Sequence, residues 1–459
     1  MTLRFFNTLS RRKEDFQPLD PPKVGLYTCG PTVYGRQHLG NYRTYIFEDL
    51  LKRVLALNGF KVRHVMNITD VGHLTSQADE GEDKMEVGSR REGKSAWDIA
   101  RIYTDAFLAD CRALRILPPD ILCRATEHIP EQVALIERLH RKGFLYGTSD
   151  GLYYDTRRFK DYGKLAGGHA AAPARARVES NPEKRNPSDF AVWKFSPKDV
   201  KRQMEWPSPW GIGFPGWHIE CSAMSMKYLG ESFDIHCGGI DHIPIHHTNE
   251  IAQSEGATGK PFVKYWLHGE FLITDAGKMA KSTGGGVNVE ELEARGFSPL
   301  DFRYHVLTAH YRRQLEFTWE FLEASKTARR RLREMTAFLQ GSPEKPACAD
   351  FAEAFKSHLA DDLNAPEALA VLWECLRRED LPPGSRLKMV ELAEQVFDLG
   401  LLDADRPAEI DDETAELIRR RAEARAQRDF ALSDKLRQSL LARGVVVEDT
   451  REGQKWRKK

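Results

Sequence analysis

Short apolar runs alternate with helical periodicity over the first seventy residues. VGLYTCG (24–30) ends in Gly-Pro and predicts a strand followed by a loop. NYRTYIFEDLLKRVLALNG (41–59) carries apolar residues at helical spacing, with Asp49 on the exposed side and Gly59 as the stop signal. KVRHVMNITD (61–70) is β-branched and predicts the next strand. Together they predict a βαβ unit of a parallel sheet, with a ligand site where the first strand ends.

The middle of the chain loses this regular alternation. Composition loosens from about residue 124 to residue 206, and 163–189, rich in Gly, Ala, Pro and Arg, predicts either a mobile loop or an inserted subdomain. From 207 to 230 a Pro/Gly loop leads into a helix that contains Cys221. A strand and loop follow at 233–243, and HHTNEIAQSEGA (246–257) predicts another helix.

Beyond about residue 300 the pattern is almost wholly helical. DFRYHVLTAHY, FLEASKTARRRLREMTAFLQ and APEALAVLWECLRR each carry helical spacing. Residues 341–350 and 403–413 have the composition of linkers. The tail, 412–459, predicts a pair of helices followed by one short strand with a basic end.

The bulk composition changes this picture little. The 459 residues are 41% apolar and 30% charged, and 68 Lys and Arg balance 68 Asp and Glu. Any nucleic-acid-binding surface must therefore be local. The N-terminus lacks an apolar segment of signal-peptide length, and no run approaches the roughly 18 apolar residues of a membrane span. Seven scattered cysteines favour a reducing cytoplasm over a disulfide framework.

Four side chains are candidate ligands for Zn²⁺: Cys29, Cys221, His246 and Glu250. His246 and Glu250 are four residues apart and would share one face of a helix. Two thiolates, an imidazole and a carboxylate suit a tetrahedral zinc site, but neither cysteine lies in a C-x-x-C pair. Buried cysteines that act as small hydrophobes are the alternative. The residues that compete as ligands are Cys237, His236, His242 and His247.

Two short segments are candidates for phosphate binding. HLGN (38–41) begins a predicted helix after a strand and loop, where helix amides can receive phosphate and Gly40 permits close approach. KMAKSTGGG (278–286) is a flexible cationic loop that could close over a triphosphate. The alternative for the second segment is a solvated surface loop.

The basic end of the tail combines an aromatic ring with cations: Lys455, Trp456, Arg457, Lys458 and Lys459. This pattern is suited to stacking on bases and to contacting phosphates. A charged end that only increases solubility is the alternative.

The order of these segments resembles that of class I aminoacyl-tRNA synthetases, and within that class the chain resembles the cysteinyl-tRNA synthetases. The resemblance covers nearly all of the sequence. The segments that carry it are FFNTLSRRKEDF, LYTCGPTVYG, NITDVG, KRNPSDFAVWK, WPSPWGIGFPGWHIECSAMS, FDIHCGGIDH, HHTNEIAQSE, KMAKS, DDLNAPEAL and WRKK.

The resemblance implies a role for each candidate. The family's zinc ligands fall on Cys29, Cys221, His246 and Glu250, whereas Cys237 stands where the family usually has glycine. The HIGH signature falls on His38, Leu39, Gly40 and Asn41, and the KMSKS signature on Lys278, Met279, Ala280, Lys281 and Ser282. The amino-acid pocket would be lined by Thr69, Trp217 and Asp241, and the tail would contact tRNA through Trp456, Arg457 and Lys458.

Two departures from the family pattern bear on catalysis. Asn41 replaces the second histidine of HIGH, so it can donate hydrogen bonds but cannot carry charge. Adenylation would then depend more on His38 and the lysines. Ala280 lacks the hydroxyl of the usual serine, although both lysines remain. Ile245 and Thr248 also differ from the usual residues, and neither is at a ligand position.

The implied reaction is the ATP-dependent ligation of L-cysteine to tRNA(Cys) through a cysteinyl-adenylate. His38 and Lys281 would bind the triphosphate, supported by Lys278 and by Mg²⁺ that arrives with ATP. Cysteine and serine differ by one atom, and an apolar pocket distinguishes such similar substrates by only about 1–3 kcal/mol of binding free energy. Zinc would instead select cysteine over serine through its preference for thiolate, without an editing domain.

The implied fold class is α/β, with a Rossmann-like parallel-sheet catalytic domain, an inserted subdomain, an all-α helical bundle and a small anticodon-binding domain. A monomer without membrane association is expected. The corresponding ranges are 1–123 and 207–300 for the catalytic halves, 124–206 for the insertion, 301–402 for the bundle and 403–459 for the anticodon-binding domain.

Two other functions are compatible with the motifs. A cysteine:amino-sugar ligase of thiol biosynthesis would keep the zinc and ATP sites but lack an anticodon module, so residues 412–459 argue against it. A non-catalytic RNA-binding paralogue is left open by Asn41. Pyrophosphate exchange and tRNA charging would separate the three.

Overall fold

The computed structural model describes residues 2–72, 84–167, 181–197, 202–274, 277–279, 286–403, 411–450 and 453–458. The chain divides into two compact units. The first contains Met1–Lys326, Glu353–Val371 and Gln395–Leu399, and the second contains Thr327–Ala352, Leu372–Glu394 and Gly400–Lys459. Among the described residues, no helix combines the length and apolarity that a membrane crossing requires.

A five-stranded sheet forms the centre of the first unit, in the order β11-β10-β3-β4-β5. All four neighbouring pairs are parallel, which confirms the predicted parallel sheet. Its strands are largely apolar because both faces are covered. Their bounds are β3 (Lys23–Thr28), β4 (Lys61–Ile68), β5 (Ile121–Arg124), β10 (Phe233–Gly239) and β11 (Val263–Gly269).

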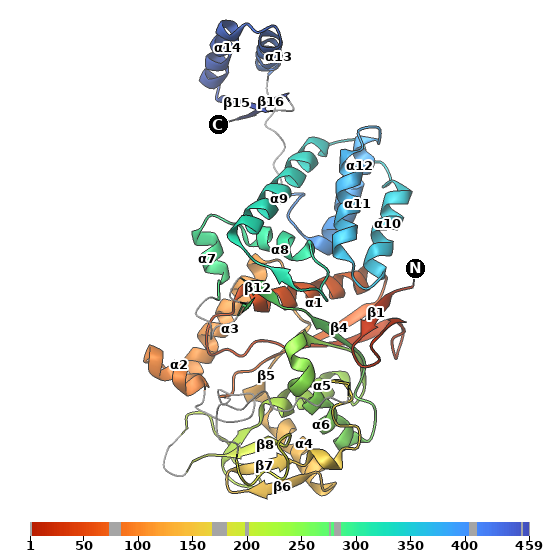
Figure 1. Cartoon of the computed structure of the whole chain (residues 1–459), viewed down its shortest axis with the longest axis vertical. Coiled ribbons are helices and arrows are strands. Elements are labelled where there is room, and N and C mark those ends of the chain that lie inside the picture. The colour runs from red at the N-terminus through yellow and green to blue at the C-terminus, as the bar shows by residue number, and fades with distance from the viewer. Residues whose placement is uncertain are drawn as a thin grey trace. The chain divides into compact units, whose positions relative to one another are not determined.

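Helices cover both faces of this sheet. Helix α1 (Leu39–Leu57) and α5 (Trp217–Leu229) pack against it from opposite sides (Figure 1). Helix α3 (Ala96–Ala113) connects β4 to β5, and α6 (Thr248–Thr258) connects β10 to β11. The strand order therefore reverses between β3 and β10. Open α/β sheets bind ligands at such a switch point, beyond the carboxyl ends of the strands.

The predicted helix 41–59 is confirmed as α1, but the expected exposure of Asp49 was wrong. Asp49 is 3% exposed and accepts hydrogen bonds from Arg53 and Arg303. The outer side of α1 packs against α8 (Pro299–Leu307), which supplies Arg303. A polar residue that faces a second helix cannot be distinguished by periodicity from one that faces water.

The described part of 124–206, with the segment up to residue 215, forms a smaller layer. Helix α4 (Ile129–Arg141) packs near an antiparallel sheet of order β6-β7-β8-β9. Trp193 and Tyr154 of this layer share a core with Ile219 of α5. Residues 168–180 lie outside the described residues. The strands are β6 (Leu145–Thr148), β7 (Gly151–Tyr154), β8 (Phe190–Phe195) and β9 (Gly213–Pro215).

Smaller elements of the first unit complete the surroundings of the site. Two further sheets pair β1 (Arg4–Asn7) with β2 (Arg12–Asp15), and β13 (Gly277–Lys278) and β14 (Leu315–Glu316) with β12 (Leu272–Thr274). The remaining helices here are α2 (Lys84–Glu92) and α7 (Val289–Ala294).

The C-terminal part is helical, as predicted, and ends in a hairpin. Four helices are followed by α13 and α14, and then by β15 and β16, which pair antiparallel. The prediction of one strand with a basic end was therefore wrong, because Lys455, Arg457 and Lys458 interrupt the apolar–polar alternation along the sequence that indicates a strand. The bounds are α9 (Trp319–Leu339), α10 (Ala349–Ala360), α11 (Ala365–Arg377), α12 (Pro383–Phe397), α13 (Asp412–Ala426), α14 (Phe430–Ala442), β15 (Val445–Thr450) and β16 (Gly453–Lys458).

Candidate active site at the switch point of the sheet

A cavity of about 360 Å³ opens beyond the carboxyl ends of β3 and β10. Two stretches of chain that are far apart in sequence meet there, 29–45 and 239–246, and α5 contributes a third side. The lining residues are Cys29, Gly30, Pro31, Thr32, Tyr34, Gln37, His38, Asn41, Thr44, Tyr45, Asn67, Thr69, Trp217, Cys221, Gly239, Asp241, His242 and His246.

The loop after β3 is held against the sheet by close backbone contacts. The amide of Cys29 donates to the carbonyl of Cys237 at 3.3 Å, and the amide of Gly30 donates to Asn67 Oδ1 at 2.8 Å. A Cβ at Gly30 would lie 1.7 Å from the carbonyl oxygen of Asn67, so only glycine fits here. This approach turns the chain over the ends of the strands and directs Cys29 toward the cavity.

Three side chains from separate elements converge beside Cys29. Cys221 lies in α5, His246 in a single π-helical turn (Ile243–His247) and Glu250 in α6. One ligating atom of each lies within 4.8 Å of the others, and all four residues are buried. A second group in the described residues shares Cys29 and Glu250 but uses His236 and His247 instead. Both groups contain the chemistry of a metal site.

The two groups differ in their access to the cavity. Cys29, Cys221 and His246 line it, whereas His236 and His247 do not. His236 Nε2 lies 2.9 Å from Glu250 Oε2 and orients that carboxylate from behind. A metal bound by the first group would face the cavity.

The donor set of the first group fits a metal ion. Glu250 Oε1 is buried and lies 3.0 Å from His246 Nε2, so the carboxylate and the imidazole face each other at close range. Once the imidazole has lost its proton, its nitrogen and the carboxylate oxygen would both present lone pairs to one cation. Two thiolates, an imidazole and a carboxylate are also ligands that Zn²⁺ accepts.

The electrostatics of the cluster shift the pKa values of its two cysteines in opposite directions. Burial would raise the pKa of Cys221, but hydrogen bonds from Cys29 and His246 outweigh it and lower the pKa to about 7. Burial would also raise the pKa of Glu250, yet His236 and His246 lower it to about 2. Burial raises the pKa of Cys29 well above its ordinary value. One thiol of the pair is therefore ready to ionise near neutral pH.

The three expected pocket residues line the same cavity. Thr69 Oγ1 donates to Glu220 Oε2 at 3.0 Å, which fixes the hydroxyl at the end of β4. The ring of Trp217 lies 4.4 Å from the ring of His246, measured between centroids. Asp241 forms an ion pair with Lys278 at 2.8 Å. Burial would raise the pKa of Asp241, but His242 and Lys278 hold it below its ordinary value.

The residues of the HIGH segment stand at the start of α1. His38 is the N-cap residue, and its amide donates to Asn41 Oδ1 at 3.2 Å. The Asn41 side chain thus caps its own helix, a role for which an amide is suited. A Cβ at Gly40 would lie 2.9 Å from His38 Nδ1 and 3.5 Å from the carbonyl of Met279, so this turn also approaches the lysine segment.

The lysine segment is described only in part. Lys278 lies in β13, and the next residue, Met279, is buried, with 2% exposed. Lys281, Ala280 and Ser282 lie outside the described residues.

The residues expected to contact tRNA lie in the second unit. Trp456 is partly buried and packs against the small core formed by Leu440, Val445 and Val447. Arg457 and Lys458 lie in the same strand, opposite Val446 and Val445.

Sequence reasoning missed several polar residues around the cavity. Glu220 is fully buried yet bonds to Thr69, and Asn67 donates to the same hydroxyl at 3.0 Å while also holding Gly30. Glu220 lies in a stretch of α5 that is buried throughout, Ile219–Ser225. A carboxylate within such a buried helix is the signal that could have identified it.

Comparison with known proteins places the chain in a family. Residues 15–327 match the family described as tRNA synthetases class I (C) catalytic domain, and residues 408–457 match the Cysteinyl-tRNA ligase anticodon binding domain. The chain belongs to the class I cysteinyl-tRNA synthetase family. The resemblance stated from the sequence motifs is therefore confirmed.

Full-length relatives agree with this assignment. The chain is 54% identical over 459 residues to cysteine–tRNA ligase 1 of Burkholderia lata, covering 99% of this chain and 97% of the relative. It is 43% identical to the cysteine–tRNA ligase of Treponema denticola, with 100% of both chains covered. As a member of this synthetase family, the chain is a ligase that uses ATP.

A solved structure shows the same fold at low sequence identity. Methionyl-tRNA synthetase of Mycobacterium tuberculosis bound by methionyl-adenylate superposes with a TM-score of 0.55 and 17% identity, covering 90% of this chain and 96% of that one. The predicted α/β class is thereby confirmed.

Proposed function

We propose that this synthetase joins L-cysteine to tRNA(Cys) in two steps. The carboxylate of cysteine first attacks the α-phosphate of ATP, which yields cysteinyl-adenylate and pyrophosphate. The terminal ribose of the tRNA then attacks the adenylate carbonyl and releases AMP. The observation that supports this proposal is that one cavity is lined by cysteine-rich candidate metal ligands, the Asp241 carboxylate and the start of α1.

We assign Zn²⁺ to the cluster of Cys29, Cys221, His246 and Glu250, because two thiolates suit zinc better than the single thiolate of the alternative group. When bound there, the metal would favour a thiol over the hydroxyl of serine as a further ligand. The selection would therefore depend on bond type, which an apolar pocket cannot match for substrates of nearly equal size.

The amino-acid side of the cavity positions the rest of cysteine. Asp241 supplies the negative charge for the substrate ammonium, since it lines the cavity close to the cluster. Thr69, fixed by Glu220, offers a hydroxyl oxygen, and the ring of Trp217 excludes water from the same wall. These contacts would direct the carboxylate of the substrate cysteine toward the nucleotide side of the cavity. Binding energy would thereby be used to orient the reacting group.

The nucleotide side is formed by α1 and the lysine segment. The amides at the start of α1 and the His38 imidazole are placed to receive phosphate oxygens, and Gly40 allows close approach. Lys278 and Lys281 would neutralise charge as pyrophosphate leaves, and Mg²⁺ would accompany ATP. Asn41 acts by capping the helix, so its lack of charge does not remove this function.

The remaining chain serves the tRNA. We propose that residues 1–123 and 207–300 form the catalytic halves, 124–206 a connective subdomain, 301–402 a stem-contacting bundle and 403–459 the anticodon reader. Trp456, with its part-exposed ring, and the neighbouring Arg457 and Lys458 are proposed to contact bases and phosphates. We further propose that the protein acts as a cytoplasmic monomer.

The match of residues 408–457 to an anticodon-binding domain disfavours the amino-sugar ligase, which needs no such module. Two assays test the proposed function. Cysteine should support ATP–pyrophosphate exchange and serine should not, and tRNA(Cys) should be charged. Equal exchange with serine would remove the metal-selection argument, and exchange without tRNA charging would favour the sugar ligase.

Trp456→Ala distinguishes the proposed tRNA-binding role of the second unit from the activation of cysteine in the cavity. It should reduce tRNA charging and leave pyrophosphate exchange unchanged, because Trp456 belongs to the second unit, whereas the residues that line the cavity belong to the first. A loss of pyrophosphate exchange in this variant would contradict the proposal that Trp456 acts only in tRNA binding.

A further inference from the structure

Arg43 is a buried cation on α1, three residues beyond Gly40. It is 3% exposed and donates one hydrogen bond to the carbonyl of Phe271 and one to the carbonyl of Arg313. Burial lowers the pKa of Arg43 to about 10, although Glu270 acts in the opposite direction. Arg43 is therefore charged at neutral pH, and backbone carbonyls rather than a carboxylate accept its hydrogen bonds.

Both carbonyls lie just before strands of the small sheet of β12, β13 and β14, here called the lysine sheet because it contains Lys278. Phe271 directly precedes β12, and its carbonyl also accepts the amide of Leu315 in β14 at 3.1 Å. Arg313 lies two residues before β14, which pairs parallel with β12. One guanidinium thus holds the start of both strands to α1.

Phe271 also contacts the first lysine of the segment. Strand β13 pairs with β12 so that Lys278 lies opposite Ile273, and Lys278 Nζ stands 4.1 Å from the centroid of the Phe271 ring. The contacts therefore run without interruption from Arg43 to the backbone of Phe271, and from the Phe271 ring to the Lys278 ammonium.

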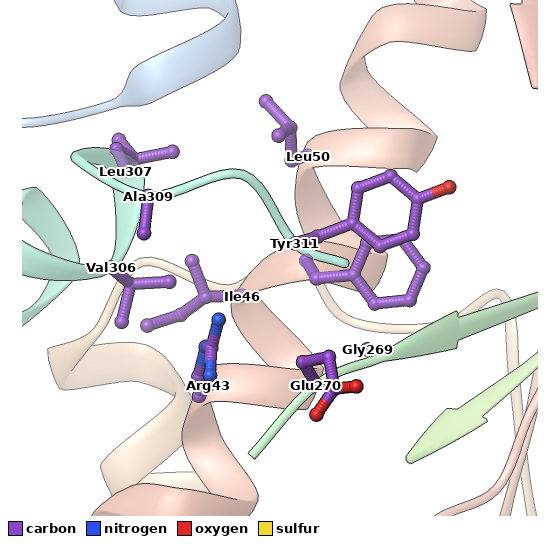
Figure 2. A pocket seen from close by; sticks show the side chains of 10 residues that line it. Arg43, Ile46, Leu50, Gly269, Glu270, Val306, Leu307, Ala309 and Tyr311 are labelled. Carbon is purple, nitrogen blue, oxygen red and sulfur yellow. The ribbon is translucent and has the colours of Figure 1, made fainter. Parts of the chain in front are cut away.

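Arg43 does not reach the substrates itself. It is missing from the lining of the active-site cavity, whereas its neighbours Asn41 and Thr44 belong to that lining. Arg43 instead lines a separate small cavity of about 20 Å³ with Glu270, Val306 and Tyr311 (Figure 2). That space is large enough for one water molecule and too small for a substrate.

We propose that Arg43 is a positioning residue for the ATP-activating step, acting through Phe271 to hold Lys278 at the nucleotide. A planar guanidinium presents its donors in a fixed fork and can hold two carbonyls at once, which a lysine ammonium on a flexible stem cannot do with the same precision. This inference rests on the proposed function, because it concerns the geometry of cysteine activation.

The first test uses Arg43→Lys, Lys278→Gln and the double variant in cysteine-dependent pyrophosphate exchange. We expect Arg43→Lys to lower kcat by roughly 10- to 100-fold, with the KM for cysteine within about two-fold, because a small misplacement harms the transition state more than binding. The double variant should be no slower than Lys278→Gln alone, within about three-fold, because both changes disable the same contact.

Independent effects that multiply in the double variant would overturn the proposal, since Arg43 would then act only by supporting the fold. Arg303→Lys is the matched control: Arg303 is fully buried and also donates to carbonyls, those of Leu114 and Phe397, and its hydrogen bonds within the described residues do not reach the lysine sheet. Arg303→Lys should lower the unfolding midpoint and leave the kcat of the folded enzyme unchanged.

Phe271→Leu tests the same link if Arg43→Lys does not fold. It removes the ring beside Lys278 but keeps the carbonyl that Arg43 holds, so kcat should again fall and the effect should again vanish in a Lys278→Gln background. An unchanged kcat would overturn the link through Phe271. Exchange by the unmodified enzyme is measured first, and its absence would reject the proposed function instead of this inference.

Discussion

Lys278 Nζ lies 2.8 Å from Asp241 Oδ2, so the first lysine of the nucleotide segment is paired with the carboxylate of the amino-acid pocket. The two groups come from β13 and from the short 3-10 helix after β10 (Ile240–His242), and both side chains keep partial exposure. A substrate ammonium that binds Asp241 must compete with Lys278, and its arrival would free the lysine for ATP.

This pair predicts opposite effects of its two members on cysteine binding without ATP. Lys278→Gln should tighten binding by about two- to five-fold, since a partly exposed ion pair contributes no more than about 1 kcal/mol. Asp241→Asn should weaken binding by more than about ten-fold, because it removes the counter-charge of the ammonium. Titration calorimetry measures both constants, and weaker binding in both variants would contradict the competition.

The two overlapping cysteine–histidine groups predict which residues hold the metal. Cys221→Ser should abolish stoichiometric zinc, whereas His247→Gln should retain it, because His247 belongs only to the group that is set back from the cavity. Metal content of the purified variants by mass spectrometry separates the groups. Zinc that follows His247 and not Cys221 would reverse the assignment.

Cys29 is common to both groups, so its replacement tests metal and substrate together. Cys29→Ser should lower the zinc content and the affinity for cysteine in parallel, because the proposed metal would also bind the sulfur of the substrate. Full zinc with unchanged cysteine affinity would exclude Cys29 from the ligand set.

The buried charges beneath α1 predict a large effect on stability. Asp49→Asn should lower the free energy of unfolding by about 3–5 kcal/mol, because it leaves the buried Arg53 and Arg303 without their shared carboxylate. Arg419→Ala, which breaks an exposed pair with Glu416, is the control and should change the urea midpoint far less. Equal shifts of the urea midpoint in the two variants would show that the buried charges contribute no more to stability than the exposed pair.

His64 predicts a loss of stability in acid. Burial, with a smaller contribution from Lys52, lowers the pKa of His64 to about 3, and the neutral ring bonds to Thr28 Oγ1 at 2.9 Å. The unfolded chain, with a pKa near 6.5, binds a proton that the folded state rejects. The stability that His64 contributes is therefore fully present above pH 6.5 and falls by up to roughly 1.4 kcal/mol per pH unit below it.

His64→Gln should flatten this decline between about pH 6 and pH 4, measured by urea unfolding at several pH values. Replacement of His140, which is exposed, should leave the slope as it is. An unchanged slope in His64→Gln would show that other groups govern the acid sensitivity.

The local elements were predictable because their signals are local. The strands around β3 and β4 and the helix α1 follow from apolar spacing with Gly and Pro at the ends, and the parallel sheet follows from their order. The second strand of the hairpin, 453–458, could not be predicted, because its charged residues interrupt the apolar–polar alternation that indicates a strand. Only the structure shows that it pairs with 445–450.

The candidate site divides in the same way. The sequence by itself determined the family, the α/β class and a set of candidate ligands, because motif order and residue chemistry are written along the chain. Only the tertiary structure decided that His246 faces the cavity while His236 stands behind Glu250, that Asp49 is buried, and that Arg43 reaches the lysine sheet. These relationships join segments from distant parts of the chain, and periodicity carries no information about which side chain of a pair lies nearer the ligand once the chain has folded.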